Sequence, residues 1–308
     1  MFVLASMLVS GRRVAAMRVD GRGHYWPVAA AARAAGVDGL EGELEALFSD
    51  WRGVLPRLKR VAKAIAAGKL KERMAVSEAQ ARLDTPLRRP PKVICVGANY
   101  ADHLAEMNAS SIKKITGLPP FFFLKPPSTV LSGPGPTVRM PRDCKNLDWE
   151  AEMVVVFGKG GKDITPECAL EHVAGYTLGI DFTARDLFSA PDSFFKFNFV
   201  LGKCQDTLSP VGPAIVPAAF ADGEDLHFSL SVNGVKKQST STRNMIYSLA
   251  EQIAGVSRGV RIEAGDLMFT GSPAGVGLPR GEKLAPGDCV RIESPVIGAM
   301  EVLIQAPV

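Results

Sequence analysis

Prolines and glycines interrupt this chain so often that a bundle of long helices is excluded. Its 308 residues include 30 glycines and 22 prolines, and they are densest in residues 119–142. Pairs such as Pro119-Pro120 and Pro126-Pro127 stop any helix that enters this stretch. The apolar run between them, residues 121–124, is expected to form a buried strand. The sequence therefore predicts a mixed α+β protein that is rich in short strands and turns.

Hydrophobic periodicity extends this interpretation along the chain. Asn233-Gly234 lies between two alternating runs and predicts a two-residue hairpin turn. No internal repeat is visible, and Gly275-Val276-Gly277 does not extend to the glycine pattern of a dinucleotide site. Strands are expected at residues 7–19 with a break at 10–11, and at 92–97, 152–157, 227–232 and 235–240. Helices are expected at residues 28–35, 41–48, 55–67, 75–83, 166–174 and 244–257.

A second proline pair marks a domain boundary. Two consecutive prolines stop any helix and favour an extended backbone before the strand that follows; they lie in the segment Leu87-Arg88-Arg89-Pro90-Pro91. We therefore divide the chain into a small N-terminal α+β domain, residues 1–90, and a larger domain, residues 91–308, which holds the candidate catalytic residues described below. The N-terminal domain carries few candidate catalytic or metal-binding residues.

Charge and cysteine content limit the partners and the compartment. The net charge is +4, which is too small to indicate nucleic-acid binding. The 5 cysteines are odd in number and form no Cys-x-x-Cys pair, so we expect neither a zinc site nor a disulfide framework. The apolar run at residues 1–10 is too short to cross a bilayer and precedes its arginines, unlike a secretory signal. We expect a cytoplasmic protein whose partners include neither nucleic acid nor a membrane.

The segment Asp148-Trp149-Glu150-Ala151-Glu152 is the strongest local signal for a functional site. Residues two apart in a strand face the same side, so Glu150 and Glu152 can present their carboxylates together. Two close anions repel, and a divalent cation relieves that repulsion. Asp181 follows an apolar run and is expected at a strand end as a third ligand. Oxygen ligands favour Mg²⁺ or Mn²⁺, with Ca²⁺ as a substitute. The alternative is a surface strand with alternating acids, which the apolar run 153–157 argues against.

The pair His103 and Glu106 is a candidate acid–base dyad. Residues three apart share a face of a helix, and a carboxylate beside an imidazole fixes its tautomer and raises its basicity. Such a pair could act as a general base on water. The alternative is an ordinary ion pair on a helix surface, and the spacing alone favours this alternative.

Two other features are candidates for binding an anionic substrate. Lys203 lies in a segment with little other charge, and it would bind an acidic substrate if it lies near the carboxylates. Residues 269–277 are rich in glycine and hydroxyl side chains, and their N–H groups could hold an anion. Arg185 and Asp186 are neighbours that could also pair with each other in a structural role.

Taken together, these segments resemble the fumarylacetoacetate hydrolase family, and in particular its bacterial acylpyruvate hydrolases and 2-hydroxyhepta-2,4-diene-1,7-dioate isomerases. The motifs follow the family's order from about residue 90 to the C-terminus; they are KVICVGANYADHLAEM, FFFLKPPST, NLDWEAEMVVVFGKGGKDI, GYTLGIDFTARDL, GKCQDTLSPVGP and GDLMFTGSPAGVG. The resemblance implies a mixed β-roll with a barrel-like sheet and the active site at its mouth. It also implies a homodimer and a smaller N-terminal domain.

The resemblance assigns roles to individual residues. The ligands of Mg²⁺ or Mn²⁺ would be Glu150, Glu152 and Asp181. The catalytic residues would be His103, Glu106 and Lys203. The substrate contacts would be Tyr100, Arg185, Thr270, Gly271 and Ser272. Residues 103–117 would form a lid that orders when substrate binds.

The chain departs from the family pattern at two positions. Many members have Gln where this chain has Phe188, and many have Trp where it has Phe199. Both positions flank the family's substrate pocket. The departures leave the metal ligands intact, so they bear on the choice of substrate.

These roles predict hydrolysis of a C–C bond in an acylpyruvate or a related 1,3-diketo acid, as in the catabolism of aromatic compounds. The metal would stabilise an enolate leaving group while His103, held by Glu106, activates water. Lys203 would offset the growing negative charge. The near alternatives on the same site are decarboxylation of oxaloacetate-like acids and isomerisation of 2-hydroxy-dienoates. A distant alternative is a non-catalytic protein that binds a metal and small acids, which has no need of a polarised base.

Overall fold

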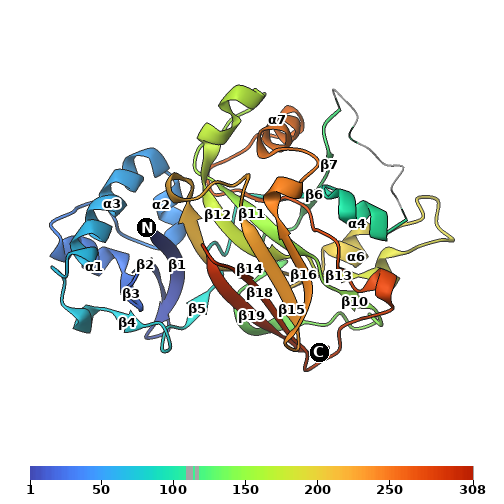
Figure 1. Cartoon of the computed structure of the whole chain (residues 1–308), viewed down its shortest axis with the longest axis horizontal. Helices are drawn as coiled ribbons and strands as arrows, with labels where there is room; N and C mark the ends of the chain where they lie inside the picture. Colours follow the sequence, from blue (N-terminus) through green and yellow to red (C-terminus); the bar gives the residue numbers. More distant parts are fainter. Residues whose placement is uncertain (109–113, 115–117, 308) are drawn as a thin grey trace.

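A computed structural model describes residues 1–108, 114 and 118–307 of the chain. These residues form a mixed α+β fold in which strands dominate, as the sequence predicts. Figure 1 shows helices α1, α2 and α3 beside strands β1–β3 at one end of the molecule, and α4 and α6 at the other end. The α-helices are α1 (Val28–Ala34), α2 (Leu44–Phe48), α3 (Trp51–Ala66), α4 (Ala101–Glu106), α5 (Arg185–Phe188), α6 (Phe199–Lys203) and α7 (Leu249–Gly259). Short 3-10 helices occur at Glu72–Met74, Pro166–His172, Ala218–Phe220, Thr242–Asn244 and Leu278–Arg280.

The largest sheet has twelve strands and is open. Its main path is β4-β3-β2-β1-β14-β12-β11-β17-β6-β7, with β5 beside β1 and β8 beside β14. The path ends at β4 and β7, so the described strands do not close into a barrel. The bounds are β1 (Phe2–Val9), β2 (Arg12–Val19), β3 (His24–Pro27), β4 (Val76–Ser77), β5 (Leu83–Asp84), β6 (Val93–Gly97), β7 (Phe121–Lys125), β8 (Leu131–Ser132), β11 (Ala151–Phe157), β12 (Val173–Ile180), β14 (Ser209–Pro217) and β17 (Leu267–Phe269).

A second sheet and a strand pair complete the fold. The second sheet has the order β16-β15-β18-β19-β9, and β10 pairs with β13. Their bounds are β9 (Gly135–Arg139), β10 (Leu147–Asp148), β13 (Thr183–Ala184), β15 (His227–Val232), β16 (Val235–Ser241), β18 (Cys289–Ser294) and β19 (Gly298–Gln305). The predicted turn at Asn233-Gly234 is confirmed: both residues have positive φ, 49° and 80°, and Val232 pairs with Val235 across the turn.

Strands β11 and β12 form the centre of the large sheet and are buried along their whole length. The β-branched run Val154-Val155-Val156 suits a strand that is covered on both faces. The two strands are antiparallel, and Glu152 pairs with Gly179. Asp181 follows the last residue of β12, and its N–H donates to the carbonyl oxygen of Glu150 at 2.8 Å. The pairing of these strands therefore brings the three candidate metal ligands to one place.

The N-terminal strands continue the same sheet. β1 and β2 form a hairpin over Ser10-Gly11, whose φ values are 48° and 78°, as the predicted break at 10–11 requires. β1 then pairs with β14, where Leu4 lies opposite Ile215. An apolar core that includes Phe48, Trp51 and Leu58 joins the helices to these strands. The N-terminal elements therefore share a sheet with the rest of the described chain. The division into two domains at residue 90 stays a prediction.

Three predicted helices need correction. Residues 75–83 form β4, a turn and β5 rather than a helix, because Val76 pairs with Tyr25 and Leu83 pairs with Met7. The helix expected from residue 244 begins only at Leu249, because Ser248 and Glu251 form a capping box there. The segment predicted at residues 166–174 is a 3-10 helix, Pro166–His172. The helices expected at 28–35, 41–48 and 55–67 are α1, α2 and α3 with shifted ends.

The strand predicted at residues 121–124 forms, but it is not buried. Phe121 is 56% exposed and Leu124 is 49% exposed, because β7 is an edge strand with a neighbour on one side only. Residues 109–113 and 115–117 of the predicted lid lie outside the described residues. Among the helices of the described part of the chain, none is long and apolar enough to span a membrane.

Candidate active site

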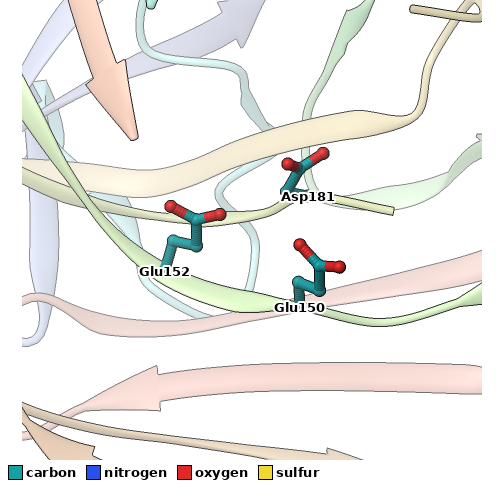
Figure 2. A group of neighbouring side chains, drawn as sticks. All are labelled: Glu150, Glu152 and Asp181. Carbon is teal, nitrogen blue, oxygen red and sulfur yellow. The ribbon is translucent and has the colours of Figure 1, made fainter. Parts of the chain in front are cut away.

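Three buried carboxylates converge at the start of β11 and the end of β12. Figure 2 shows Glu150, Glu152 and Asp181 grouped beside the strands that carry them. Each offers one oxygen, and these oxygens all lie within 4.8 Å of one another. The exposed fractions of the residues are 8%, 2% and 1%. The structure thus brings together the acids that the sequence proposed as a metal site.

Cationic side chains surround two of the three acids. The Nζ atom of Lys203 lies 2.7 Å from Glu150 and 2.8 Å from Asp181. The guanidinium of Arg185 lies 2.8 Å from Glu150. Among the ion pairs of the described residues, none involves Glu152, which instead accepts a hydrogen bond of 2.5 Å from the N–H of Gly271. One carboxylate of the triad is therefore left without a cation.

Lys125 is a site residue that the sequence analysis missed. Its ammonium forms a buried ion pair with Asp181 and donates to the hydroxyl of Ser209 at 2.8 Å. The signal was present in β7, because alternation places Phe121, Phe123 and Lys125 on one face of the strand. Of these three residues, Lys125 is the buried one, at the end of the strand just before two prolines.

The pKa shifts follow from this uneven distribution of charge. Burial opposes the ionisation of Glu150, but Lys203 and Arg185 outweigh it and hold the pKa of Glu150 below its usual range. Burial raises the pKa of Glu152 well above its usual range, and the charges of Asp181 and Glu150 raise it further. Burial disfavours the charge of Lys203, but Asp181 and Glu150 raise its pKa. A divalent cation fits this donor set, because it would supply the positive charge that Glu152 lacks.

Asp148 links the triad to the glycine-rich loop. Its carboxylate accepts hydrogen bonds from the N–H of Gly277 at 2.6 Å and of Leu278 at 3.2 Å. The Nε atom of Arg185 donates to the same carboxylate at 2.8 Å. Asp148 is fully buried, so it fixes both the loop and the arginine that pairs with Glu150.

Replacing Asp148 with asparagine is expected to destabilise the fold. An amide oxygen accepts the backbone hydrogen bonds more weakly, and Arg185 loses one of its two carboxylate partners and keeps only Glu150. Breaking a buried ion pair in this way costs about 3–5 kcal/mol. Urea unfolding followed by circular dichroism measures the change. The exposed Asp143 provides the control, because Asp143→Asn should change stability by less than about 0.5 kcal/mol. Wild-type stability of Asp148→Asn would contradict this account of the loop.

His103 and Glu106 form a hydrogen-bonded pair on α4. The Nδ1 atom of His103 lies 2.9 Å from Oε1 of Glu106. The other oxygen of Glu106 accepts a hydrogen bond of 2.8 Å from the N–H of Gly275. His103 is close enough to Glu150 for its charge to help lower the pKa of that acid. The pair is therefore anchored to the glycine-rich loop beside the triad, unlike an ion pair on a free helix surface.

The loop residues predicted to bind substrate mainly support the site itself. The hydroxyl of Thr270 donates to the carbonyl of Met153 at 2.8 Å, and that of Ser272 accepts from Gln238 at 2.9 Å. Gly271 has a φ of 99°, and a Cβ there would lie 2.7 Å from the Cβ of Asn99, so only glycine fits. A substrate contact by these loop residues, or by Arg185, stays a prediction.

Tyr100 directly precedes α4. Its side chain is fully buried, and its hydroxyl has no hydrogen-bond partner among the described residues. Burial raises the pKa of Tyr100, and the nearby charge of Glu152 adds to this effect. The predicted contact of Tyr100 with substrate stays a prediction.

Comparison with known proteins identifies the family. Residues 92–305 match the family described as fumarylacetoacetate (FAA) hydrolase C-terminal. The chain is 37% identical over 228 residues to oxaloacetate tautomerase fahd2, mitochondrial, from Xenopus laevis, covering 73% of this chain and 69% of the relative.

Two solved structures resemble the chain over nearly its whole length. A probable 2-hydroxyhepta-2,4-diene-1,7-dioate isomerase from Mycobacterium abscessus has a TM-score of 0.76 and 28% identity over 99% of both chains. The fumarylacetoacetate hydrolase of Exiguobacterium antarcticum has a TM-score of 0.74 and 31% identity, over 99% of this chain and 100% of that chain. The chain therefore belongs to the fumarylacetoacetate hydrolase family, as its motifs indicated.

Proposed function

We propose that this chain is a divalent-metal-dependent enzyme that interconverts the keto and enol forms of a 2-oxo acid. One observation carries the proposal: a histidine oriented by a glutamate stands beside a buried triad of carboxylates. The likeness to the Xenopus laevis protein, which is named an oxaloacetate tautomerase, supports this choice of reaction over the hydrolysis expected from the motifs.

Glu150, Glu152 and Asp181 would hold the cation. Among the described residues the converging group consists of carboxylates alone, and carboxylate oxygens suit Mg²⁺ or Mn²⁺. When bound, the cation supplies a Lewis acid that stabilises negative charge on the oxygens of a 2-oxo acid.

The side chains of the protein move the proton. His103 acts as the base that removes a proton from carbon 3 of the keto form, and the resulting imidazolium gives a proton to the 2-oxo oxygen to form the enol. The same two steps in reverse return the proton to carbon 3. Glu106 orients the imidazole through Nδ1 and stabilises the imidazolium, while the N–H of Gly275 holds Glu106 in place. Lys203 brings positive charge to the side of the site where the substrate oxygens gain negative charge.

Hydrolysis of a C–C bond in an acylpyruvate is the second candidate function. His103 would then take a proton from water that attacks the more distant carbonyl carbon. The likeness to the Exiguobacterium antarcticum hydrolase over the whole chain supports this candidate. Isomerisation of a 2-hydroxy-dienoate needs the same proton transfer. Decarboxylation of an oxaloacetate-like acid depends less on the dyad.

A product analysis separates these reactions. The protein is incubated with Mg²⁺ and either oxaloacetate or an acylpyruvate, while enol absorbance and NMR spectra are recorded. Tautomerisation changes the enol absorbance without loss of carbon, whereas hydrolysis yields a carboxylic acid and pyruvate. We expect faster enol–keto interconversion than in buffer. Rates equal to buffer for both acids would contradict the proposal.

The proposal extends to a homodimer in the cytoplasm. All five cysteines are free in the structure, which agrees with a reducing compartment. The Xenopus laevis relative, by contrast, carries a mitochondrial name.

A further inference from the structure

An aromatic surface adjoins the triad and has no part in the proton transfer proposed above. It consists of five phenylalanines whose rings contact one another, here called the phenylalanine wall: Phe121, Phe123, Phe188, Phe197 and Phe199. Phe199 is its centre, with its ring centroid between 5.0 and 5.7 Å from those of the other four. Such ring contacts define one continuous apolar surface.

The elements that carry most of the wall also carry the cations of the site. On β7, alternation places Phe121 and Phe123 on the same face as Lys125. On α6, Phe199 and Lys203 are four residues apart and share a face. On α5, Arg185 and Phe188 are three residues apart. The wall is therefore adjacent to the cationic side chains that form ion pairs with the triad.

Close packing ties the wall to the site on the cation side. A Cβ at Gly202 would lie only 2.8 Å from the Cα of Phe188, so Phe188 rests directly against the backbone beside Lys203. On the other side, Phe121 and Leu104 line the same cavity, of about 170 Å³. Leu104 follows His103 on α4. The wall thus extends from the cations toward the helix that carries the dyad.

Much of the wall is open to solvent. Phe121 is 56% exposed, Phe197 is 45% exposed, and Phe188 and Phe199 are half-buried. Contiguous exposed apolar surfaces are found where proteins bind ligands, membranes or other proteins. Its continuity with the triad favours a ligand that occupies both at once.

Resting on the proposed function, we infer that the phenylalanine wall binds the apolar tail of the substrate. The substrate is then a 2-oxo acid that carries a large aromatic or alkyl group. Two strand residues span about 6.6 Å and one helical turn about 5.4 Å. A chain of about four or five C–C bonds, each about 1.5 Å long, covers these distances from the cations to the wall. A carboxylate at the end of a tail of this length would face phenyl rings, which favours an apolar tail over a long dicarboxylate.

Binding measurements test the inference without relying on turnover. Calorimetry of the Mg²⁺-loaded protein compares pyruvate with 4-phenyl-2-oxobutanoate. We expect the phenyl compound to bind at least about 10-fold tighter, and Phe199→Ala to weaken it about 10- to 100-fold, as loss of a buried aromatic contact predicts. Pyruvate affinity should fall much less. Phe195→Ala is the matched control, because Phe195 lies in the segment just before α6, is 69% exposed and is outside the wall.

Each outcome decides a separate question. Equal affinity for the two acids, or an unchanged preference in Phe199→Ala, would overturn the inference and leave the proposed function standing. Phe188→Gln repeats the test if Phe199→Ala does not fold. If both wall variants change sedimentation rather than ligand preference, a second copy of the chain covers the wall and the inference is wrong. If neither acid binds, the proposed function fails and the inference fails with it.

Discussion

Replacing His103 with alanine is expected to lower kcat by roughly 10²–10⁴-fold, the usual contribution of a positioned general base. The reason is geometric: both oxygens of Glu106 are engaged, one with His103 at 2.9 Å and one with the N–H of Gly275 at 2.8 Å, so the imidazole is the member of the dyad left to take the proton. Metal binding should change little, because His103 is not one of the three converging carboxylates. Steady-state kinetics with Mg²⁺ and a calorimetric titration with Mn²⁺ measure the two effects.

Two further variants make this result specific to the dyad. Glu106→Gln should act in the same direction, because an amide does not stabilise an imidazolium as a carboxylate does. The losses of the single variants should not add in the double variant, since the two side chains work as a unit. His227→Ala is the control, because the side chain of His227 is 71% exposed and belongs to β15 of the other sheet. Wild-type rates in His103→Ala would show that the dyad is only an ion pair on a helix.

Replacing Glu152 with glutamine is expected to abolish metal-dependent activity while the protein stays folded. Glu152 has no ion-pair partner among the described residues, so the substitution removes a metal-binding charge without leaving a cation unpaired. Relief of its repulsion with Asp181 and Glu150 should leave the metal-free Tm unchanged or higher. In the wild type, EDTA should abolish activity, Mg²⁺ or Mn²⁺ should restore it, and either metal should raise the Tm.

The thermal shift separates a metal ligand from a merely buried acid. Glu152→Gln should lose the rise in Tm that Mg²⁺ or Mn²⁺ produces in the wild type. The exposed Glu167 provides the control, and Glu167→Gln should retain that rise. A metal-induced rise of wild-type size in Glu152→Gln, or full activity of rigorously metal-free protein, would rule out the triad as the metal site.

Local patterns in the sequence were enough to predict much of this site. Alternation along β11 placed Glu150 and Glu152 on one side, and helical spacing placed His103 beside Glu106. These predictions depend on backbone geometry that a few neighbouring residues determine. The hairpin at Asn233-Gly234 was predictable for the same reason, since few residues other than Asn and Gly adopt positive φ there.

Long-range contacts account for what the sequence did not predict. Lys125 reaches Asp181, 56 residues later, and its role emerges only when β6 and β17 bring β7 to the edge of the sheet. Glu106 accepts a hydrogen bond from the N–H of Gly275, 169 residues away in the sequence. Val76 and Leu83 have helical spacing, yet pairing with β3 and β1 outweighs that local preference. Periodicity within a window carries no information about such partners.

Exchange of solvent deuterium into carbon 3 of a 2-oxo acid tests the central claim most directly. Proton NMR follows the carbon-3 protons of 2-oxobutanoate in deuterated buffer, since their loss reports each proton that the enzyme removes. We predict that the Mg²⁺-loaded wild type exchanges them well above the buffer rate, and that neither His103→Ala nor the EDTA-treated protein does. Exchange at the buffer rate in the loaded wild type, or at the wild-type rate in His103→Ala, would contradict a metal-dependent proton transfer by this dyad.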